Sequence, residues 1–260
     1  MIRPITPLRS FVSNVRFYLL YLSRSRIDAT LNFLLPIFYA TIAHLIAEAS
    51  PDKIDPLAIT VGAGLMGMWT TVMYGAGGLI KEQRRLGLLE LLLAAPGYFP
   101  SSIASMTIAV SLFGFEAMLG TVAWAYFVFD VNVASNILFE LVVTAGIAVI
   151  AMSAVGFMVA AVFVRVRKAE SVAEAVIAPL WLLSGVLIPV STLPSSVQLI
   201  SKLLPMTFGA QALRAATRGV WDLQAIGTCF LLSLIYGVIG WMAVSAAARS
   251  SRSHGGMHLW

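Results

Sequence analysis

The sequence predicts an all-α integral membrane protein: six transmembrane helices, an N-terminal interfacial amphipathic helix, a cytosolic helix and short outer-face helices between spans 5 and 6. Composition is the first reason, since 59% of the 260 residues are hydrophobic, only 11% are charged and the mean hydropathy is +0.90. A soluble domain carries about 25% charged residues. The other two reasons are the long apolar runs and the alternating charge of the segments between them. We expect residues 1–260 to form a single transmembrane domain.

The N-terminal segment, 1–26, is not a secretory signal, because Arg16 interrupts its apolar stretch and no small-residue cleavage site follows. Drawn as a helix, it has one apolar stripe and an arginine-rich opposite face. The stripe consists of Phe11, Val15, Tyr18 and Leu22. This pattern is typical of a helix that lies in the membrane interface.

Six apolar segments are long enough to cross a bilayer, which takes about 20 helical residues. They are 27–47, 57–80, 103–129, 137–164, 172–190 and 226–248. Most of the 17 Lys and Arg residues lie in the N-terminal segment, the second-to-third and fourth-to-fifth connections and the C-terminal tail. By the positive-inside rule, both termini and the segment 81–96 are therefore expected to be cytoplasmic.

The segment 81–96, KEQRRLGLLELLLAAP, has a charged head followed by a run of leucines. Its apolar part, 86–93, is too short to cross a membrane. The leucines fall on nearly every side of a helical wheel, which is not the pattern of a half-solvated surface helix. We therefore expect this helix to be buried on two sides, packed against its own bundle on one side and against a partner protein on the other.

The connection 191–224 contains two short helical patterns, 195–204 and 208–217, separated by Pro205. Lys202, Arg214 and Arg218 argue against a seventh span, since each charge at the centre of a membrane costs about 3 kcal/mol on insertion scales. We expect a pair of short helices on the outer face.

Three groups of residues, in the same order and spacing, resemble the permease subunits of ABC-2 type ATP-binding-cassette exporters. The first is an acidic and basic head followed by Gly, Glu, Leu-Leu and Pro, here Glu82, Arg84, Gly87, Leu88, Leu89, Glu90, Leu91, Leu92 and Pro96. The second is SGVLIP at 184–189 with Leu193-Pro194, and the third is LPMTF at 204–208 with ALR at 212–214. The chain departs from the family pattern at Leu88, Leu204 and Phe208, where Thr, Asn and Tyr are frequent.

The resemblance implies a half-transporter in the cytoplasmic membrane of a bacterium or archaeon. Two permease chains, identical or paralogous, would work with two copies of an ABC ATPase subunit and move a drug-, lipid- or glycan-like amphipathic cargo outward. The chain has no GxxxxGK[ST] phosphate loop. It is therefore expected to bind no cofactor and to be no enzyme, with ATP and Mg on the partner subunit.

The same resemblance makes the Leu-rich segment a coupling helix that docks in a groove of the ATPase. The expected docking residues are Glu82, Arg85, Leu86, Leu89, Glu90 and Leu93. The outer-loop motif is represented by Gly185, Pro189, Pro194, Pro205 and Arg214. The alternative for the Leu-rich helix is burial against its own bundle alone.

Other residues are candidates for the translocation path. Glu116 lies near the middle of the third span without a basic partner at i±4, and such a carboxylate either contacts a polar substrate or hydrogen-bonds to a neighbouring helix. His44 and Glu48 are one turn apart near the outer end of the first span. Further expected lining residues are Met66, Met68, Trp69, Met73, Phe113 and Trp124. Ala63, Gly67, Thr71 and Gly75 form a small-residue ridge that permits close helix packing, within the chain or across a dimer.

The sequence leaves three alternatives to a transporter permease: a proton-coupled carrier, a membrane-embedded enzyme and a membrane scaffold without transport activity. A proton-coupled carrier with Glu116 as the relay would explain the buried carboxylate, but it explains neither the Leu-rich helix nor the lack of a clear internal repeat. A membrane-embedded enzyme needs a cluster of catalytic or metal-ligating side chains, which the sequence does not present. The positive charge lies at the ends of the spans, a distribution that indicates a lipid bilayer as the partner and not nucleic acid.

Overall fold

The computed structural model describes residues 7–49, 55–94, 99–165, 179, 183–186, 190 and 193–253. Every regular element in these ranges is helical. Within them, five helical segments are long and apolar enough to cross a membrane: 29–49, 56–85, 99–129, 135–164 and 223–250. These segments confirm five of the predicted spans. The remaining one, 172–190, lies almost wholly outside the described residues.

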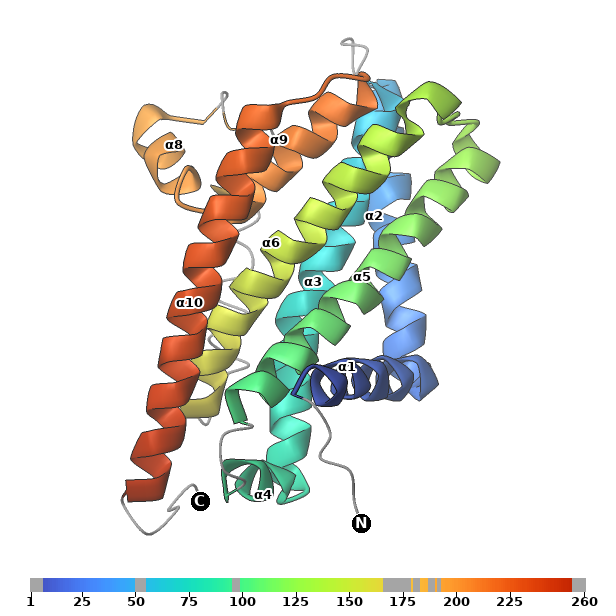
Figure 1. The fold of residues 1–260 in the computed structure, drawn as a ribbon. Helices are drawn as coiled ribbons and strands as arrows, with labels where there is room; N and C mark the ends of the chain where they lie inside the picture. Colours follow the sequence, from blue (N-terminus) through green and yellow to red (C-terminus); the bar gives the residue numbers. More distant parts are fainter. Residues whose placement is uncertain are drawn as a thin grey trace.

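Over the described residues, the bundle contains α2 (Arg26–Ala49), α3 (Pro56–Arg85), α5 (Phe99–Phe129), α6 (Leu138–Arg165) and α10 (Leu223–Ser253), drawn as long, side-by-side helices in Figure 1. Helix α3 lies at its centre, in contact with α2, α5 and α6. The exposed faces of α2 and α10 carry large apolar side chains, which is the distribution expected where a helix faces lipid.

Helix α1 (Pro7–Arg24) lies across one end of the bundle, roughly perpendicular to the spans (Figure 1). Tyr18 and Leu22 of its apolar stripe are buried, and the helix packs chiefly on α5. Arg9, Arg16 and Arg24 are exposed. The stripe and the arginine face therefore lie as the helical wheel predicts.

The predicted helical segment 81–96 is in fact divided between two helices. Helix α3 continues through the charged head to Arg85, and a separate helix, α4 (Leu88–Ala94), follows after a turn. Gly87 makes this turn with a φ of +69°, a left-handed conformation that glycine adopts without steric cost. A glycine just past the last residue of a helix commonly ends it, so the break has a signal in the sequence.

Close packing of α3 depends on glycines of the small-residue ridge. A Cβ atom built on Gly67 would lie 2.2 Å from Cγ of Pro36, and one built on Gly75 would lie 2.6 Å from Cγ1 of Val110. The ridge therefore brings α3 against α2 and α5 within the chain.

The opposite end of the bundle carries η1 (Ser135–Ile137), α8 (Ser195–Ser201) and α9 (Pro205–Thr217). Two short helices were predicted here, but the second begins at Pro205 and not at 208. Proline is tolerated at the first helical position because its missing N–H would have no helical partner there. Pro205 thus starts α9 and does not merely separate two helices.

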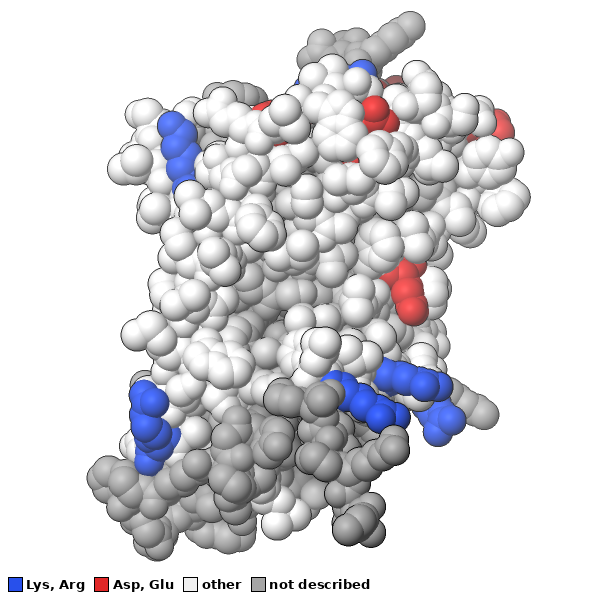
Figure 2. Space-filling model, in the orientation of Figure 1, with Lys and Arg blue, Asp and Glu red and all other residues white. Residues whose placement is uncertain are grey.

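Charged side chains divide between the two ends. In Figure 2, most of the visible Lys and Arg side chains lie at the end that carries α1 and α4, and most visible Asp and Glu side chains lie toward the other. We refer to these as the α4 end and the α9 end.

Candidate functional site

Helix α4 has one buried face and one exposed face. Leu89 and Leu93, one turn apart, are only 1% and 2% exposed and belong to the core of the bundle. Leu88 and Leu91 point away, and Leu91 is 67% exposed. Helix α4 contacts α3, α5 and α10. Its own bundle therefore buries one of the two sides that were expected to be buried.

This burial changes which residues are open to a partner. Leu89 and Leu93 were expected to dock, but both are occupied within the chain. Within the leucine run 86–93, the leucines that remain exposed are Leu86, Leu88 and Leu91, and we call this set the leucine face. The side chain of Glu90 lies outside the part of the chain that the structure describes.

Glu82 and Arg85, also expected to dock, pair with each other. Nη2 of Arg85 donates to Oε1 of Glu82 at 2.6 Å, and Nε donates to Oε2 at 2.9 Å. Arg85 is highly exposed, and an ion pair that is open to solvent stabilises a fold only weakly. A partner's charges could therefore replace this pair at little cost.

Arg84 lies in the last turn of α3, just before α4, and is hydrogen-bonded to a helix that is distant in the sequence. The sequence alone did not suggest this role. Its Nη2 donates to the carbonyl oxygens of Phe163 at 3.1 Å and of Val164 at 3.0 Å. Both carbonyls belong to the last turn of α6, where helical carbonyls lack partners and a cation is favourable. Arg84 thus ties the last turn of α3 to the end of α6.

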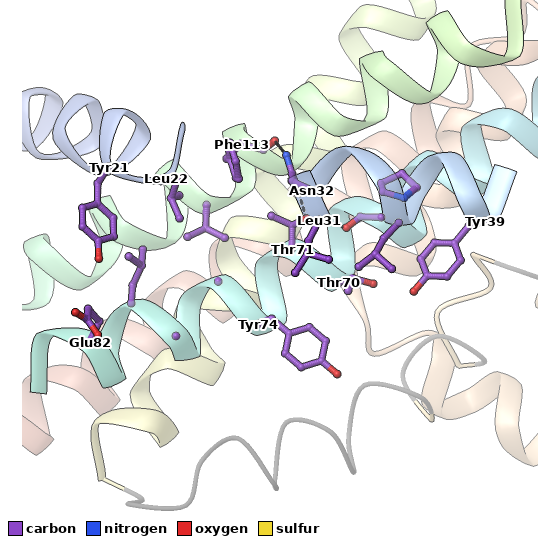
Figure 3. A pocket seen from close by; sticks show the side chains of 17 residues that line it. Tyr21, Leu22, Leu31, Asn32, Tyr39, Thr70, Thr71, Tyr74, Glu82 and Phe113 are labelled. Atoms are coloured by element: carbon purple, nitrogen blue, oxygen red, sulfur yellow. Dashed lines mark hydrogen bonds between the residues drawn. The ribbon is translucent and has the colours of Figure 1, made fainter. Parts of the chain in front are cut away.

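A groove of about 650 Å³ runs along α2 and α3, with α1 at one end and α5 behind it. It is lined by Tyr21, Leu22, Leu31, Asn32, Leu35, Pro36, Tyr39, Gly67, Thr70, Thr71, Tyr74, Gly75, Gly78, Leu79, Glu82, Val110 and Phe113. Figure 3 shows Tyr21 and Glu82 toward one end and Tyr39, Thr70 and Tyr74 toward the other. Tyrosine presents an apolar ring and a polar tip, so the groove suits a molecule with both kinds of surface.

The floor of the groove is a hydrogen-bonded contact between three helices. Thr71 Oγ1 donates to Oδ1 of Asn32 at 2.6 Å, and Asn32 Nδ2 donates to the carbonyl of Phe113 at 2.9 Å. Asn32 is buried. Such bonds between spanning helices satisfy polar groups that lipid cannot, so they fix α2 against α3 and α5.

Most of the expected translocation residues do not line this groove. Trp69 and Met73 are buried in the core at 1% exposure each, Met66 is half-buried, and of the further candidates only Phe113 reaches the groove. His44 is buried, with Nε2 3.0 Å from Thr60 Oγ1 and its ring stacked 4.4 Å from that of Phe129. Glu48 is exposed at the α9 end.

Glu116 is exposed on α5 and makes no hydrogen bond to any residue that the structure describes. The expected hydrogen bond to a neighbouring helix is therefore absent from the described part of the chain.

The outer-loop motif is held by Arg214. Its Nη2 donates to the carbonyls of Gly185 and, at 2.6 Å, of Val186. Burial lowers the pKa of the guanidinium, with repulsion from Arg218 as the smaller cause. Gly185 has a φ of +69°, and Pro194 lies directly before α8. Pro189 falls outside the described residues.

Sequence reasoning missed the groove, although its tyrosines are visible in the sequence. Tyr21, Tyr39 and Tyr74 each interrupt an apolar run with a polar tip, but their convergence depends on how α1, α2 and α3 pack. Over the described ranges no group of three or more His, Cys, Asp or Glu residues could hold a metal ion.

The model of the family described as ABC-2 type transporter matches residues 10–217, from within α1 to the end of α9. Among curated proteins no match is found.

Proposed function

Because the chain belongs to the ABC-2 type transporter family, and is thus a multi-pass permease of an ABC transporter, we propose that it is the membrane subunit of an ATP-driven exporter. A separate ATPase subunit supplies ATP hydrolysis and binds ATP and Mg. Two permease chains, identical or paralogous, combine with two such ATPases. The segment 172–190 completes the bundle as a sixth span.

The observation that carries the proposal is the exposed leucine face at the more basic end of the molecule. The positive-inside rule makes this end cytoplasmic. Leu86, Leu88 and Leu91 would then face water, where three exposed leucines within six positions of the chain favour a protein partner. An ATPase groove provides that cover.

The orientation predicts the labelling of single cysteines. Cys229 is fully buried and should give little background. In right-side-out vesicles a membrane-impermeant maleimide should label Lys202→Cys and not Arg249→Cys, an exposed position near the end of α10 outside the leucine face, and in inverted vesicles the order should reverse. Labelling of Arg249→Cys from the outside would contradict the orientation.

Docking predicts that Leu91→Arg separates the chain from its ATPase. Placing a charge in the centre of an apolar contact should lower the amount of co-purified ATPase about ten-fold, since about 1.4 kcal/mol of lost affinity suffices for that factor. The measurement is a pull-down in mild detergent from native membranes.

The matched control is Leu199→Arg, an exposed leucine on α8 at the opposite end. It should recover as much ATPase as the wild type. Equal recovery with Leu91→Arg would contradict docking through the leucine face, and absence of any ATPase with the wild type would contradict the exporter proposal itself.

The mechanism uses the connections described above. Closure of the ATPases on ATP displaces α4, and Arg84 transmits the displacement from the end of α3 to α6. The two states of the bundle then differ in access to the groove along α2 and α3. ATP shifts this equilibrium only if the ATPases bind the two states with different affinity.

The groove is the proposed binding region for cargo, and its mixture of tyrosine, threonine and apolar side chains supports an amphipathic cargo moved outward. A proton-coupled carrier is less well supported, because Glu116 is not among the residues that line the groove.

A further inference from the structure

A second, smaller hollow lies where α1 turns into α2. It has a volume of about 400 Å³ and is lined by Phe17, Leu20, Tyr21, Arg24 and Ser25. Phe17 is 60% exposed, Leu20 45% and Tyr21 41%, so three large apolar or aromatic side chains surround it without being covered by the bundle. We call this hollow the elbow pocket.

The elbow pocket contains one available cation. Arg24 is exposed and makes no hydrogen bond or ion pair with any residue that the structure describes. It occupies the last turn of α1, where the helix dipole favours positive charge. A guanidinium offers a planar pair of N–H groups that matches two oxygens of a phosphate.

The place of the pocket in the fold determines which phosphate can reach it. Helix α1 lies across the spans at the α4 end, with its apolar stripe against the bundle and its arginines outward (Figures 1 and 2). In the proposed orientation this is the depth of the phospholipid head groups in the cytoplasmic leaflet. A free anion would gain nothing from Phe17 and Leu20, whereas a lipid covers them with its first methylene groups.

We propose that the elbow pocket binds a phospholipid of net negative charge in the cytoplasmic leaflet, with the phosphate on Arg24 and the chain along Phe17 and Leu20. In a zwitterionic phospholipid the choline ammonium group competes with Arg24 for the same phosphate, so such a lipid binds less well. Tyr21 lines both the elbow pocket and the groove along α2 and α3. A lipid bound in the elbow pocket therefore lies beside the groove. Tyr21 contacts both this lipid and any molecule that is bound in the groove. The inference uses the proposed orientation but requires no ATPase.

Photolabelling in nanodiscs tests the site. The full chain is placed in phosphatidylcholine nanodiscs that contain a trace of phosphatidylglycerol or phosphatidylcholine with a diazirine in one acyl chain. After irradiation, mass spectrometry quantifies the lipid attached to residues 17–25. The anionic lipid should label this segment about five-fold more than the zwitterionic lipid, the ratio expected for about 1 kcal/mol per basic residue at an anionic surface.

Three variants separate a built site from a diffuse positive field. Arg24→Gln should abolish the preference for the anionic lipid, and Arg24→Lys should retain most of it. Arg9→Gln, which removes an exposed arginine at the far end of the same helix, should leave it unchanged. Both side chains, Arg24 and Arg9, are exposed, so the fold is expected to tolerate each change.

Several results would overturn the proposal. One is equal labelling by the two lipids in the wild type, and another is a preference that survives Arg24→Gln. A loss with Arg9→Gln as large as with Arg24→Gln would assign the effect to the whole face of α1. Competition by excess inorganic phosphate would identify a soluble phosphate as the ligand in place of a lipid. All these results are independent of whether an ATPase binds at α4, so this proposal and the exporter proposal fail separately.

Discussion

Gly67→Leu is expected to yield almost no folded protein. Even the Cβ atom of an alanine at this position would lie 2.2 Å from Cγ and 2.6 Å from Cβ of Pro36. Both atoms belong to a rigid ring inside α2, so the conflict cannot be relieved by a change of rotamer. Helices α2 and α3 must move apart. This movement breaks the hydrogen bonds that join Thr71, Asn32 and the carbonyl of Phe113.

Gly67→Ala is a smaller change at the same position, and its effect on stability can be measured on folded protein. Overpacking costs about 1–3 kcal/mol and occasionally more, whereas replacing a glycine by alanine inside a helix ordinarily gains about 0.5–1 kcal/mol. Gly78 is the matched control, since it lies on the same helix and a Cβ atom there meets nothing within 4 Å. Gly78→Ala should therefore leave the thermal unfolding temperature unchanged or raise it, and Gly67→Ala should lower it.

Thermal unfolding in detergent, followed by size-exclusion chromatography, measures both variants. A Gly67→Ala protein as stable as Gly78→Ala would show that α2 is not pressed against α3 in the membrane.

Arg84→Met is expected to preserve ATPase binding but to remove most of the conformational response to ATP. The variant keeps the leucine face and loses two charge-assisted hydrogen bonds to the last turn of α6. Bonds of this kind are each worth about 1.5–3 kcal/mol. Loss of even one corresponds to a reduction of ten-fold or more in the coupling between α3 and α6.

A reporter in the groove makes this measurable without knowing the cargo. Gly78→Cys, in a chain that carries Cys229→Ala, places one thiol among the residues that line the groove. ATP should change its rate of reaction with a maleimide in the otherwise unmodified complex, and Arg84→Met should reduce that change at least ten-fold while equal ATPase is recovered. Arg84→Lys should be intermediate, because lysine keeps the positive charge but its shorter side chain does not place a donor where Nη2 lies.

If Arg84→Met leaves the ATP response intact, transmission does not pass through the α3–α6 contact. If it also releases the ATPase, Arg84 supports the shape of α4 and the role assigned to it in coupling is wrong.

The spans could be predicted from the sequence because their information is local. Apolar length defines five helices that the structure confirms, and the helical periodicity of α1 places Tyr18 and Leu22 on its buried face. The burial of α4 against its own bundle could be anticipated from its all-round leucines, and its contact with a partner stays a prediction. Which leucines face inward could not, because all of them are chemically equal and only the angle between α3 and α4, set at Gly87, decides between them.

The candidate site was less accessible to such reasoning. Arg84 is one of several basic residues at the end of a span, and its partners are backbone carbonyls 79 and 80 positions away, which carry no mark in the sequence. The groove is a product of packing between helices distant in the chain. Trp69 and Met73 are predicted to line a path because an apolar cavity is expected from the composition, but a glycine-rich α3 allows its neighbours close enough to enclose them.

The exposed leucine face also has a consequence for the biogenesis of the transporter. If α4 docks on an ATPase as proposed, a permease chain inserted before its ATPase is available would display Leu88 and Leu91 to the cytosol. Chaperones and proteases of the quality-control machinery recognise such apolar surface, so an unassembled chain should be short-lived. Assembly would then set the cellular ratio of the two subunits. Permease chains in excess of the ATPase would be degraded, and chains whose α4 is bound to the ATPase would be protected.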